Sequence, residues 1–376
     1  MLVLNMHYNR NPSTLQLEIS SNCNLGCPGC VRTLFSSIEK YDDPDVSVDI
    51  YNLKLETNPA IPKNEFLSFD VFTKLIDSDI IKNNVKRIEF IGTIDDPLAH
   101  PEFLDMVDYI VTNTNHLILI HTNASLRSPD YFTKLANLFA KNDIPHRIHF
   151  SIDGLEDTNH LYRRGSNWNK IIKNAQAFLD ESKRLSNLDY AEDALWQWLI
   201  FPWNEHQTDQ AKQLAKDMGF ARFMSRPDRA LAHVDLNKAI RRKHQIGWEE
   251  LNSHQADKMD EYIHCKQQHM YFVDYKGCVW PCCFIGNRNY NGLHKEVHEI
   301  QDQRFEIYGE NWNNLNYYTL DEIIESEFYK NDLVDSWKSK CHGTGPKDRI
   351  MRCTQTCSVS ELKKRPLLGL VAEDIQ

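Results

Sequence analysis

The distribution of cysteine is the feature that most limits how this chain can fold. Of its 376 residues, ten are cysteines, and they form two groups. Three lie between Cys23 and Cys30, seven lie between Cys265 and Cys357, and the 234 residues from 31 to 264 contain none. Disulfide frameworks are typical of short secreted chains, whereas clustered cysteines in a long chain are typical of metal or iron–sulfur sites. The distribution therefore predicts two metal or cluster sites in a reducing, cytoplasmic environment.

Charge and hydropathy argue against several kinds of partner. The chain has 43 Lys and Arg against 53 Asp and Glu, a net charge of −10, which counts against binding to nucleic acid. Apolar residues make up 41%, enough for a buried core. No apolar run approaches the ~18 residues that span a bilayer, and the start lacks a basic region followed by an apolar stretch. We therefore expect no membrane segment and no secretory signal.

Short apolar or alternating runs are separated by helical patterns in the first two thirds of the chain. Strands are predicted at residues 15–20, 87–91, 117–121, 148–152, 196–201 and 221–224. Helices are predicted at 69–76, 129–141, 168–184 and 207–218, with Ser68 capping the first and Gly219 ending the last. Strands alternating with helices predict a parallel sheet, and six units are too few for a full barrel. The expected fold class is α/β, an open, partial (β/α)6 TIM-like barrel.

The remaining chain is expected to form further units. Residues 1–229 are assigned to the barrel, with an insertion or lid, alternatively a solvated loop, at about 35–65. Residues 230–262 are polar with helical spacing and predict a bridge. Residues 263–376 predict a small Cys-rich α+β domain, whose hairpin would turn at 275–277.

The first cysteine group has a spacing suited to an iron–sulfur cluster. Cys23, Cys27 and Cys30 follow the pattern C-x3-C-x2-C directly after the first strand, where (β/α) enzymes place their chemistry. Three thiolates on a four-iron cluster leave one iron with an open coordination position. Zinc is the alternative, but structural zinc usually has four ligands, and this loop supplies three.

At these residues the chain resembles the radical S-adenosylmethionine (radical SAM) superfamily. The resemblance implies a [4Fe–4S] cluster on Cys23, Cys27 and Cys30, with SAM bound to the fourth iron. Transfer of one electron would then cleave SAM, and the resulting 5′-deoxyadenosyl radical would take a hydrogen atom from the substrate. The protein would direct the radical and exclude water.

Segments at the ends of later strands also resemble this family. In residues 92–97 (G-T-I-D-D-P), Asp96 and Pro97 match the loop that holds the SAM amino group, while Asp95 stands where the family usually has Gly. Residues 121–124 (H-T-N-A) and 151–154 (S-I-D-G) resemble its T-N-G and S-I-D-G segments. The implied SAM contacts are Asp95, Asp96, Thr122, Asn123, Ser151, Asp153, Arg163, Arg164 and Asn204. The alternatives are an ordinary strand-end turn for the Asp-Pro segment, surface ion pairs for the arginines and loop packing for Asn204.

The second cysteine group resembles the auxiliary-cluster domains called SPASM and twitch. Cys265 and Cys282 give C-x11-G-x4-C around Gly277, and Cys353 and Cys357 give C-x3-C. The full SPASM run is absent, so the resemblance favours twitch, with one auxiliary [4Fe–4S] cluster on these four cysteines. Cys283, Cys278 and Cys341 are alternates, and a structural zinc site is the competing interpretation.

The resemblance implies a cytoplasmic radical SAM enzyme. Its auxiliary cluster would accept an electron or position the substrate, and a flavodoxin or ferredoxin would donate electrons. The substrate is expected to be a peptide or protein, or a small molecule, with a slight preference for a polypeptide. The alternatives are a sugar or cyclitol dehydrogenase of the same superfamily and a non-catalytic iron–sulfur or zinc protein; Asp95 in place of Gly favours the latter.

Overall fold

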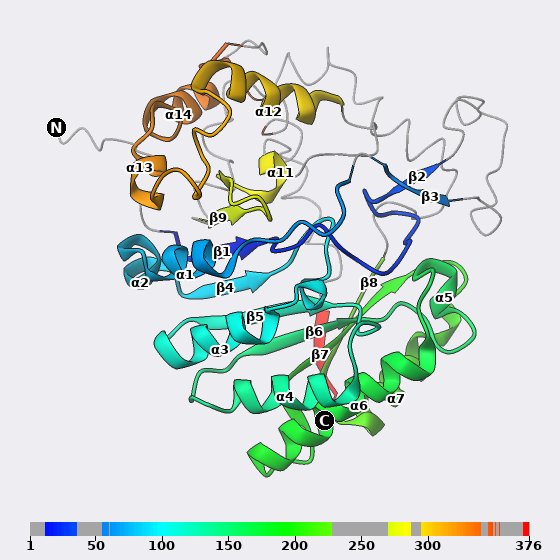
Figure 1. The fold of residues 1–376 in the computed structure, drawn as a ribbon. Helices are drawn as coiled ribbons and strands as arrows, with labels where there is room; N and C mark the ends of the chain where they lie inside the picture. The colour runs from blue at the N-terminus through cyan, green and yellow to red at the C-terminus, as the bar shows by residue number, and fades with distance from the viewer. Residues whose placement is uncertain are drawn as a thin grey trace, which may run out of the picture.

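The fold is built on one open and mostly parallel sheet. The computed structural model describes residues 12–35, 55–59, 61–227, 270–286, 295–339, 345–348, 350, 353 and 371–375. Within them, a nine-stranded sheet has the order β10-β9-β1-β4-β5-β6-β7-β8-β11 (Figure 1). All neighbours from β9 to β8 are parallel, and β10 and β11 close the two edges in antiparallel pairing.

The six strands expected from the sequence are all present. They are β1 (Thr14–Leu17), β4 (Arg87–Phe90), β5 (Leu117–Thr122), β6 (Arg147–Ser151), β7 (Ala191–Ile200) and β8 (Phe220–Pro227). They neighbour one another in chain order, so their carboxyl ends meet at one edge of the sheet. The predicted partial (β/α)6 barrel is confirmed. β7 begins earlier than expected, at Ala191, because it continues to pair with β8 through a register shift.

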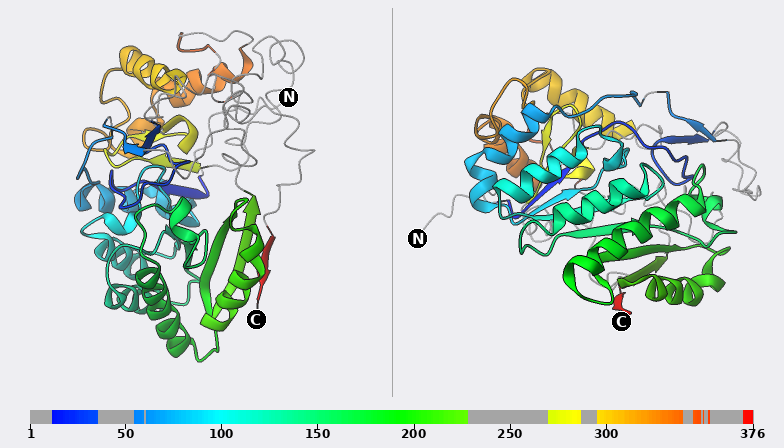
Figure 2. Two further views of the ribbon diagram at one scale, coloured as in Figure 1. Left: turned by 90° about the vertical axis from the view of Figure 1, so that its right-hand side faces the viewer. Right: turned by 60° about the horizontal axis from the view of Figure 1, so that its bottom comes forward.

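Helices connect these strands and cover one side of the sheet (Figures 1 and 2). The four predicted helices are α1 (Phe69–Asp77), α4 (Pro129–Phe139), α6 (Trp168–Ser186) and α7 (Thr208–Met218). Further helical segments are α2 (Asp79–Asn84), η2 (Pro97–Ala99), α3 (Phe103–Asn113), α5 (Asn159–Tyr162) and η3 (Glu205–Gln207). The Ser68 side chain accepts a hydrogen bond from Val71 N, and Gly219 ends α7 with a φ of 97°, so both predicted boundary residues are confirmed.

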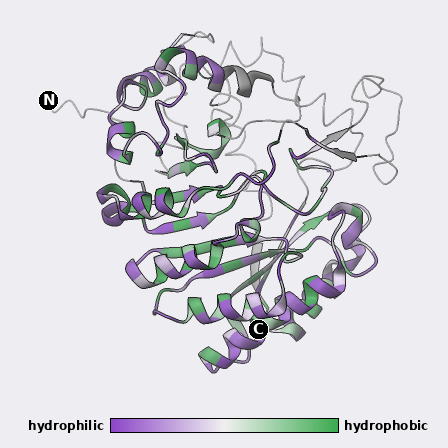
Figure 3. Ribbon diagram, in the orientation of Figure 1, coloured by the Kyte–Doolittle hydropathy of each residue, from purple (hydrophilic) through white to green (hydrophobic). Residues whose placement is uncertain are grey.

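Aromatic and aliphatic side chains fill the space between the sheet and these helices. Phe150, near the carboxyl end of β6, stacks on Phe132 of α4 and contacts Phe178 of α6 and Phe220 of β8 edge to face. All four rings are almost fully buried. Figure 3 shows hydrophobic helix faces turned toward the sheet and hydrophilic faces turned away. The burial of this apolar surface holds the helices against the strands, so the strand ends that carry the site are fixed.

The C-terminal part of the chain continues the same sheet. β9 (Met270–Val273) and β10 (Val279–Trp280) form the predicted hairpin, and Gly277 has a φ of 83° in its turn. β9 also pairs with β1 in parallel, which the sequence did not indicate. The remaining elements are α11 (Cys283–Gly286), α12 (Lys295–Tyr308), α13 (Leu320–Ile324), the π-helical turn η5 (Phe328–Asp332), α14 (Leu333–Lys338) and β11 (Val371–Asp374).

Two predicted segments lie wholly or partly outside the described residues. Of the insertion at about 35–65, β3 (Leu55–Thr57) is described and pairs with β2 (Thr33–Phe35), but residues 36–54 are not. The bridge at 230–262 lies outside them entirely. The proposed division at residues 230 and 263 stays a prediction. Among the helices of the described residues, none combines the length and apolar character needed to cross a bilayer.

The cap of α1 gives a test of the local helix boundary. Ser68→Ala removes the acceptor for Val71 N, so we expect the free energy of unfolding to fall by about 1 kcal/mol. Ser128 also precedes a helix, α4, but its side chain makes no capping hydrogen bond. Ser128→Ala is therefore the matched control and should change stability much less. Urea denaturation followed by circular dichroism measures both, and equal losses would contradict the assignment.

Candidate functional site

The three predicted cluster cysteines lie together beyond the carboxyl end of β1. They belong to residues 18–32, here called the Cys loop, which joins β1 to β2. Cys27 is buried, Cys23 and Cys30 are partly buried, and none of the three forms a disulfide. Cys30 N donates to the Cys27 carbonyl at 3.0 Å, which closes the loop into a tight turn. The spacing therefore brings three thiols to the edge of the sheet where (β/α) enzymes carry their sites.

Hydrogen bonds to two neighbouring strand ends and to the segment after α5 hold the Cys loop in place. Asp96 N, after β4, donates to the Asn22 carbonyl at 3.0 Å. After β5, Asn123 Nδ2 lies 3.7 Å from Cys23 Sγ, within hydrogen-bond reach for sulfur. After α5, the Arg164 carbonyl accepts from Gly26 N at 2.9 Å. The loop is thus fixed to segments that are far from it in the sequence.

The surroundings of the thiols favour a bound positive centre. Burial raises the pKa of Cys23 to about 12 and that of Cys27 to about 11, and burial also raises the pKa of Cys30. Each thiol also raises the pKa of another of the three, so the three side chains are mutually close. Such a set is neutral on its own and ionises when a metal centre compensates the charge. The donor set fits an iron–sulfur cluster in this respect.

A single-ion site is not present in the described part of the chain. No group of three or more His, Cys, Asp and Glu side chains there is arranged to hold one metal ion. Each cysteine of an iron–sulfur cube binds a different iron, so its ligands stand farther apart than those of one ion. This finding therefore leaves the fit to a cluster unchanged.

A buried ion pair connects the Cys loop to β6. Arg163 Nε donates to Asp153 Oδ2 at 2.6 Å, and the Asp153 side chain is fully buried. Leu199 N donates to Asp153 Oδ1 at 2.7 Å. The same guanidinium lies 4.0 Å from Cys27 Sγ through Nη1. Arg163 was considered as a partner of the SAM carboxylate, and the structure places it between Asp153 and the thiol.

Asp96 links the loop after β4 to the end of β5. Its carboxylate accepts from Leu98 N, from Thr122 Oγ1 and from Asn123 N, at distances of 2.8 to 3.1 Å. Burial raises the pKa of Asp96, and these hydrogen bonds lower it. Both carboxylate oxygens are therefore engaged with the protein, and Asp96 shapes the loop rather than leaving its charge exposed.

The other predicted contacts fall into two groups. Asn204 is fully buried, and its side chain hydrogen-bonds Phe201 N, the Asp153 carbonyl and the Leu199 carbonyl, which matches the loop-packing alternative. Ser151 and Arg164 are partly buried near the same rim. Gly154, which follows Asp153, is needed because a Cβ there would lie 2.2 Å from Asn159 N.

Two residues at this edge were missed by the sequence reasoning. Glu18 and Arg32 are both buried, at the start and the end of the Cys loop. Both hydrogen-bond to the loop after β4, which lies more than sixty residues away in the chain. No local pattern marks such contacts. A charged residue inside the predicted strand at 15–20 is the one available signal for Glu18.

Comparison with known proteins agrees with this geometry. Residues 17–188 match the family model described as the Radical SAM superfamily. These residues form a radical SAM domain. The predicted superfamily is therefore confirmed for this part of the chain.

Individual proteins that are similar to this chain share little sequence identity with it. A "Tungsten-containing aldehyde ferredoxin oxidoreductase cofactor-modifying protein" of Pyrococcus furiosus is 28% identical over 151 residues, which span 40% of this chain and 33%, about a third, of that protein. The solved structure titled "Native anSMEcpe with bound AdoMet" has a TM-score of 0.48 and 14% identity, with 92% of this chain and 88% of that one covered. Streptococcus suis SuiB has a TM-score of 0.44 and 14% identity, covering 74% and 62%.

The cysteines beyond the radical SAM domain are only partly described. Cys282, Cys278 and Cys353 are buried and Cys283 is partly buried, whereas Cys265, Cys341 and Cys357 lie outside the described residues. Cys282 and Cys278 both act electrostatically on the buried Tyr329, so they lie near one another. Cys353 acts in the same way on Arg304. The auxiliary ligand set therefore stays a prediction.

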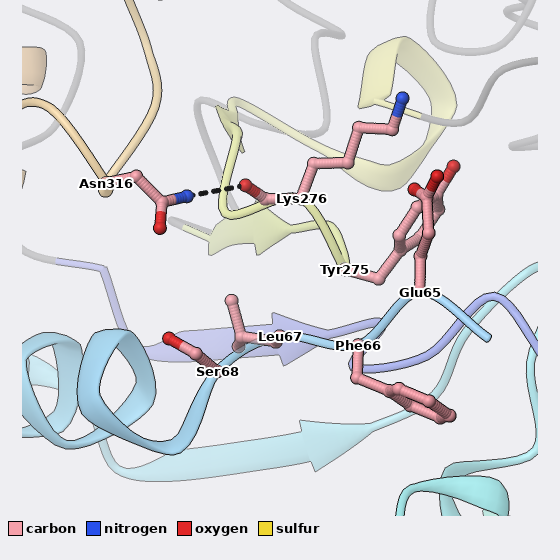
Figure 4. A pocket seen from close by; sticks show the side chains of 7 residues that line it. All are labelled: Glu65, Phe66, Leu67, Ser68, Tyr275, Lys276 and Asn316. Carbon is pink, nitrogen blue, oxygen red and sulfur yellow. Dashed lines mark hydrogen bonds between the residues drawn. The ribbon is translucent and has the colours of Figure 1, made fainter.

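A groove lies where the radical SAM domain meets the C-terminal hairpin. It has a volume of about 370 Å³ and is lined by Glu65, Phe66, Leu67, Ser68, Tyr275, Lys276 and Asn316 (Figure 4). Asn316 Nδ2 donates to the Lys276 carbonyl across its rim at 3.0 Å. The groove includes none of the predicted cluster cysteines.

The Asp153–Arg163 pair predicts a large effect from a small change. Asp153→Asn removes the negative charge and leaves a mostly buried guanidinium without a counter-charge, so we expect stability to fall by about 3 kcal/mol. The control is Asp70→Asn, in which a mostly exposed carboxylate loses its ion pair with Lys74. That change should have little effect. Urea denaturation compares the two, and similar losses would contradict the role of the buried pair.

Proposed function

We propose that this protein is a radical SAM enzyme that cleaves S-adenosylmethionine reductively and uses the product to take a hydrogen atom from its substrate. The observation that carries the proposal is the gathering of Cys23, Cys27 and Cys30 at the sheet edge inside the matched domain. When bound, a [4Fe–4S] cluster on these thiolates supplies the electron for that cleavage.

The residues around the thiols have defined tasks in this proposal. Arg163 places a positive charge beside Cys27, which offsets the negative charge of bound thiolates, and Asp153 fixes its orientation. Asn123 directs an amide N–H at Cys23 Sγ. Hydrogen bonds to the sulfurs help set the potential of such a cluster. These residues therefore tune the site as well as shape it.

The SAM contacts follow from the same edge of the sheet. We assign the loop after β4, which includes Asp95 and Asp96, to the SAM amino group. Thr122, Asn123, Ser151 and Arg164 lie at the ends of the next segments and are assigned to the rest of the molecule. Three further residues are assigned to positioning these contact residues, because their polar groups form hydrogen bonds within the protein. They are Asp153, Arg163 and Asn204.

We propose a polypeptide substrate in preference to a small molecule. β2 follows the Cys loop directly and pairs with β3, so part of the insertion forms an ordered ribbon beside the proposed reaction site. Such a ribbon can form one wall of a cleft for an extended chain. A sugar or cyclitol dehydrogenase of the same superfamily is the alternative, and modification of a cofactor is suggested by the printed name of the Pyrococcus furiosus relative.

We further propose one auxiliary [4Fe–4S] cluster on Cys265, Cys282, Cys353 and Cys357. It would accept an electron from the substrate radical, since four protein ligands leave no iron open for substrate. Its supports are the sequence pattern and the burial of Cys282 and Cys353. A flavodoxin or ferredoxin in a reducing cytoplasm would supply electrons to the site at Cys23, Cys27 and Cys30.

The enzymatic proposal is tested by the fate of SAM. Anaerobically reconstituted protein, incubated with SAM and dithionite, should release 5′-deoxyadenosine, and Cys27→Ala should reduce release to background because one iron loses its ligand. Chromatography measures the product. Asp70→Asn is the control, since Asp70 is a mostly exposed residue of α1 that belongs to neither ligand set nor to their alternates. The absence of product from the wild-type protein containing its clusters would contradict the proposal.

Iron content tests the auxiliary site separately. The variant with Cys23, Cys27 and Cys30 all changed to Ala should retain about four irons per chain. Adding Cys282→Ala and Cys353→Ala should remove them. Elemental analysis measures iron and zinc together. Zinc in the triple variant would support the structural-zinc alternative, and a triple variant free of metal would contradict an auxiliary site.

A further inference from the structure

Two carboxyl groups and a guanidinium tie the Cys loop to the loop after β4. The second loop, residues 91–96, is here called the Asp loop. Glu18 Oε2, at the start of the Cys loop, accepts from Thr93 N at 2.6 Å and from Ile94 N at 3.1 Å. In the reverse direction, Asp95 Oδ2 accepts from Ser20 N at 3.1 Å. Each loop thus supplies a carboxyl group that binds the backbone of the other.

Arg32 joins the same two loops through their carbonyl groups. Its Nη1 donates to the Ser21 carbonyl at 2.5 Å and to the Ile94 carbonyl at 2.7 Å, and the residue is 7% exposed. Glu18, Asp95 and Arg32 are together called the interloop clamp. Its hydrogen bonds run to both donors and acceptors of the two backbones, so neither loop can shift alone without breaking several of them.

The packing around Asp95 leaves no room for adjustment. Its Oδ1 is enclosed and accepts no hydrogen bond. A Cβ at position 92 would lie 1.6 Å from this oxygen and 3.0 Å from Glu18 Cγ, so Gly92 is required for the two carboxyl groups to fit. Asp95 is therefore enclosed against the Asp loop itself.

Burial and the neighbouring charges oppose ionisation of both carboxyl groups, those of Glu18 and Asp95, at the same time. Glu18 faces Arg32 on one side and Asp274 of the hairpin on the other, and Asp95 faces Glu18 and Asp96. Burial raises the pKa of Glu18 to about 7, with Asp274 raising it further and Arg32 lowering it. Burial and then Glu18 raise the pKa of Asp95 well above its usual range. Two like charges so close and so dry do not ionise together near neutral pH.

We propose that Glu18 and Asp95 act, with Arg32, as positioning residues that set the Cys loop and the Asp loop in register for SAM. A glycine at position 95 would leave the Asp loop flexible. Asp95 instead connects the Asp loop to the Cys loop. This inference rests on the proposed function, because it assigns the Asp loop to the SAM amino group. The interloop clamp itself does not depend on that assignment.

The sign of the pH effect follows from the raised pKa values. Because the folded protein holds the proton more tightly than the unfolded chain, the pair stabilises the fold most below about pH 4.5, and this contribution decreases as the pH rises through about 7. We therefore expect the free energy of unfolding to fall as the pH rises from about 4.5 to about 7.

Variants at position 95 separate the clamp from its charge. Asp95→Gly removes the acceptor for Ser20 N, and we expect SAM binding to weaken about tenfold to a hundredfold, since displacing a bound group by about 1 Å has effects of that size. Asp95→Asn keeps an acceptor oxygen but carries no charge. It should bind SAM within about threefold of the wild type at pH 7.

The matched control is another buried carboxyl group away from both loops. Asp193 of β7 accepts from Ser182 Oγ, and burial raises its pKa to about 6. Asp193→Asn makes the same chemical change and should leave the SAM affinity as in the wild type. Equilibrium dialysis of SAM against the reconstituted full-length protein at pH 7 measures all four proteins.

Amide hydrogen exchange gives a second readout that needs no SAM. In the same reconstituted proteins, Asp95→Gly should speed exchange at residues 18–22 and 92–96, whereas Asp95→Asn should preserve their protection. Wild-type exchange in Asp95→Gly, or loss of protection at these residues in Asp95→Asn, overturns the proposal. If the wild-type protein binds no SAM, the proposed function fails, and the exchange result alone then supports or overturns the interloop clamp.

Discussion

The ion pair between Arg163 and Asp153 is the interaction on which the geometry of the site depends. A fully buried carboxylate is stable only with a compensating charge, and Asp153 has it at 2.6 Å. The position of Asp153 is fixed by β6 and by Leu199 N of β7, so the guanidinium has one available place. That place is beside Cys27. The barrel therefore determines where the positive charge lies, and the positive charge determines where thiolates can gather.

The same reasoning explains why a chain with a net charge of −10 carries arginine at this edge. Buried acids and thiols are concentrated there, and each raises the cost of ionising the next. Arg163 and Arg32 are the buried or mostly buried cations that face them among the described residues. Both arginines also hydrogen-bond the backbone or side chains of neighbouring loops, so the charge that makes the site possible also gives it shape.

Much of the barrel could be predicted because its signals are local. Alternation within residues 117–121 and 148–152 predicts strands without reference to the rest of the chain, and Ser68 and Gly219 mark helix ends by their own chemistry. The pairing of β9 with β1 and the bonds of Glu18 to the Asp loop join residues that are far apart in the chain. Neither local periodicity nor residue type records such a partner. The sequence therefore indicates the cysteines and several residues that hold them, such as Asp96 and Asn123, but not Glu18 and Arg32.

Asp95 shows how a departure from a family pattern can be understood only with its distant neighbours. Taken alone, an acid in place of glycine suggests a damaged loop. In the structure, Asp95 accepts from Ser20 N, Glu18 binds the backbone that Asp95 belongs to, and Gly92 leaves the space that both carboxyl groups occupy. Gly92, three residues earlier, thus leaves the space that the Asp95 side chain needs. Asp95 in turn adds a hydrogen bond to the Cys loop. The departure is better explained as a stiffer version of the loop than as a loss of function, because Gly92 gives the acid its space and Ser20 N gives it a hydrogen bond.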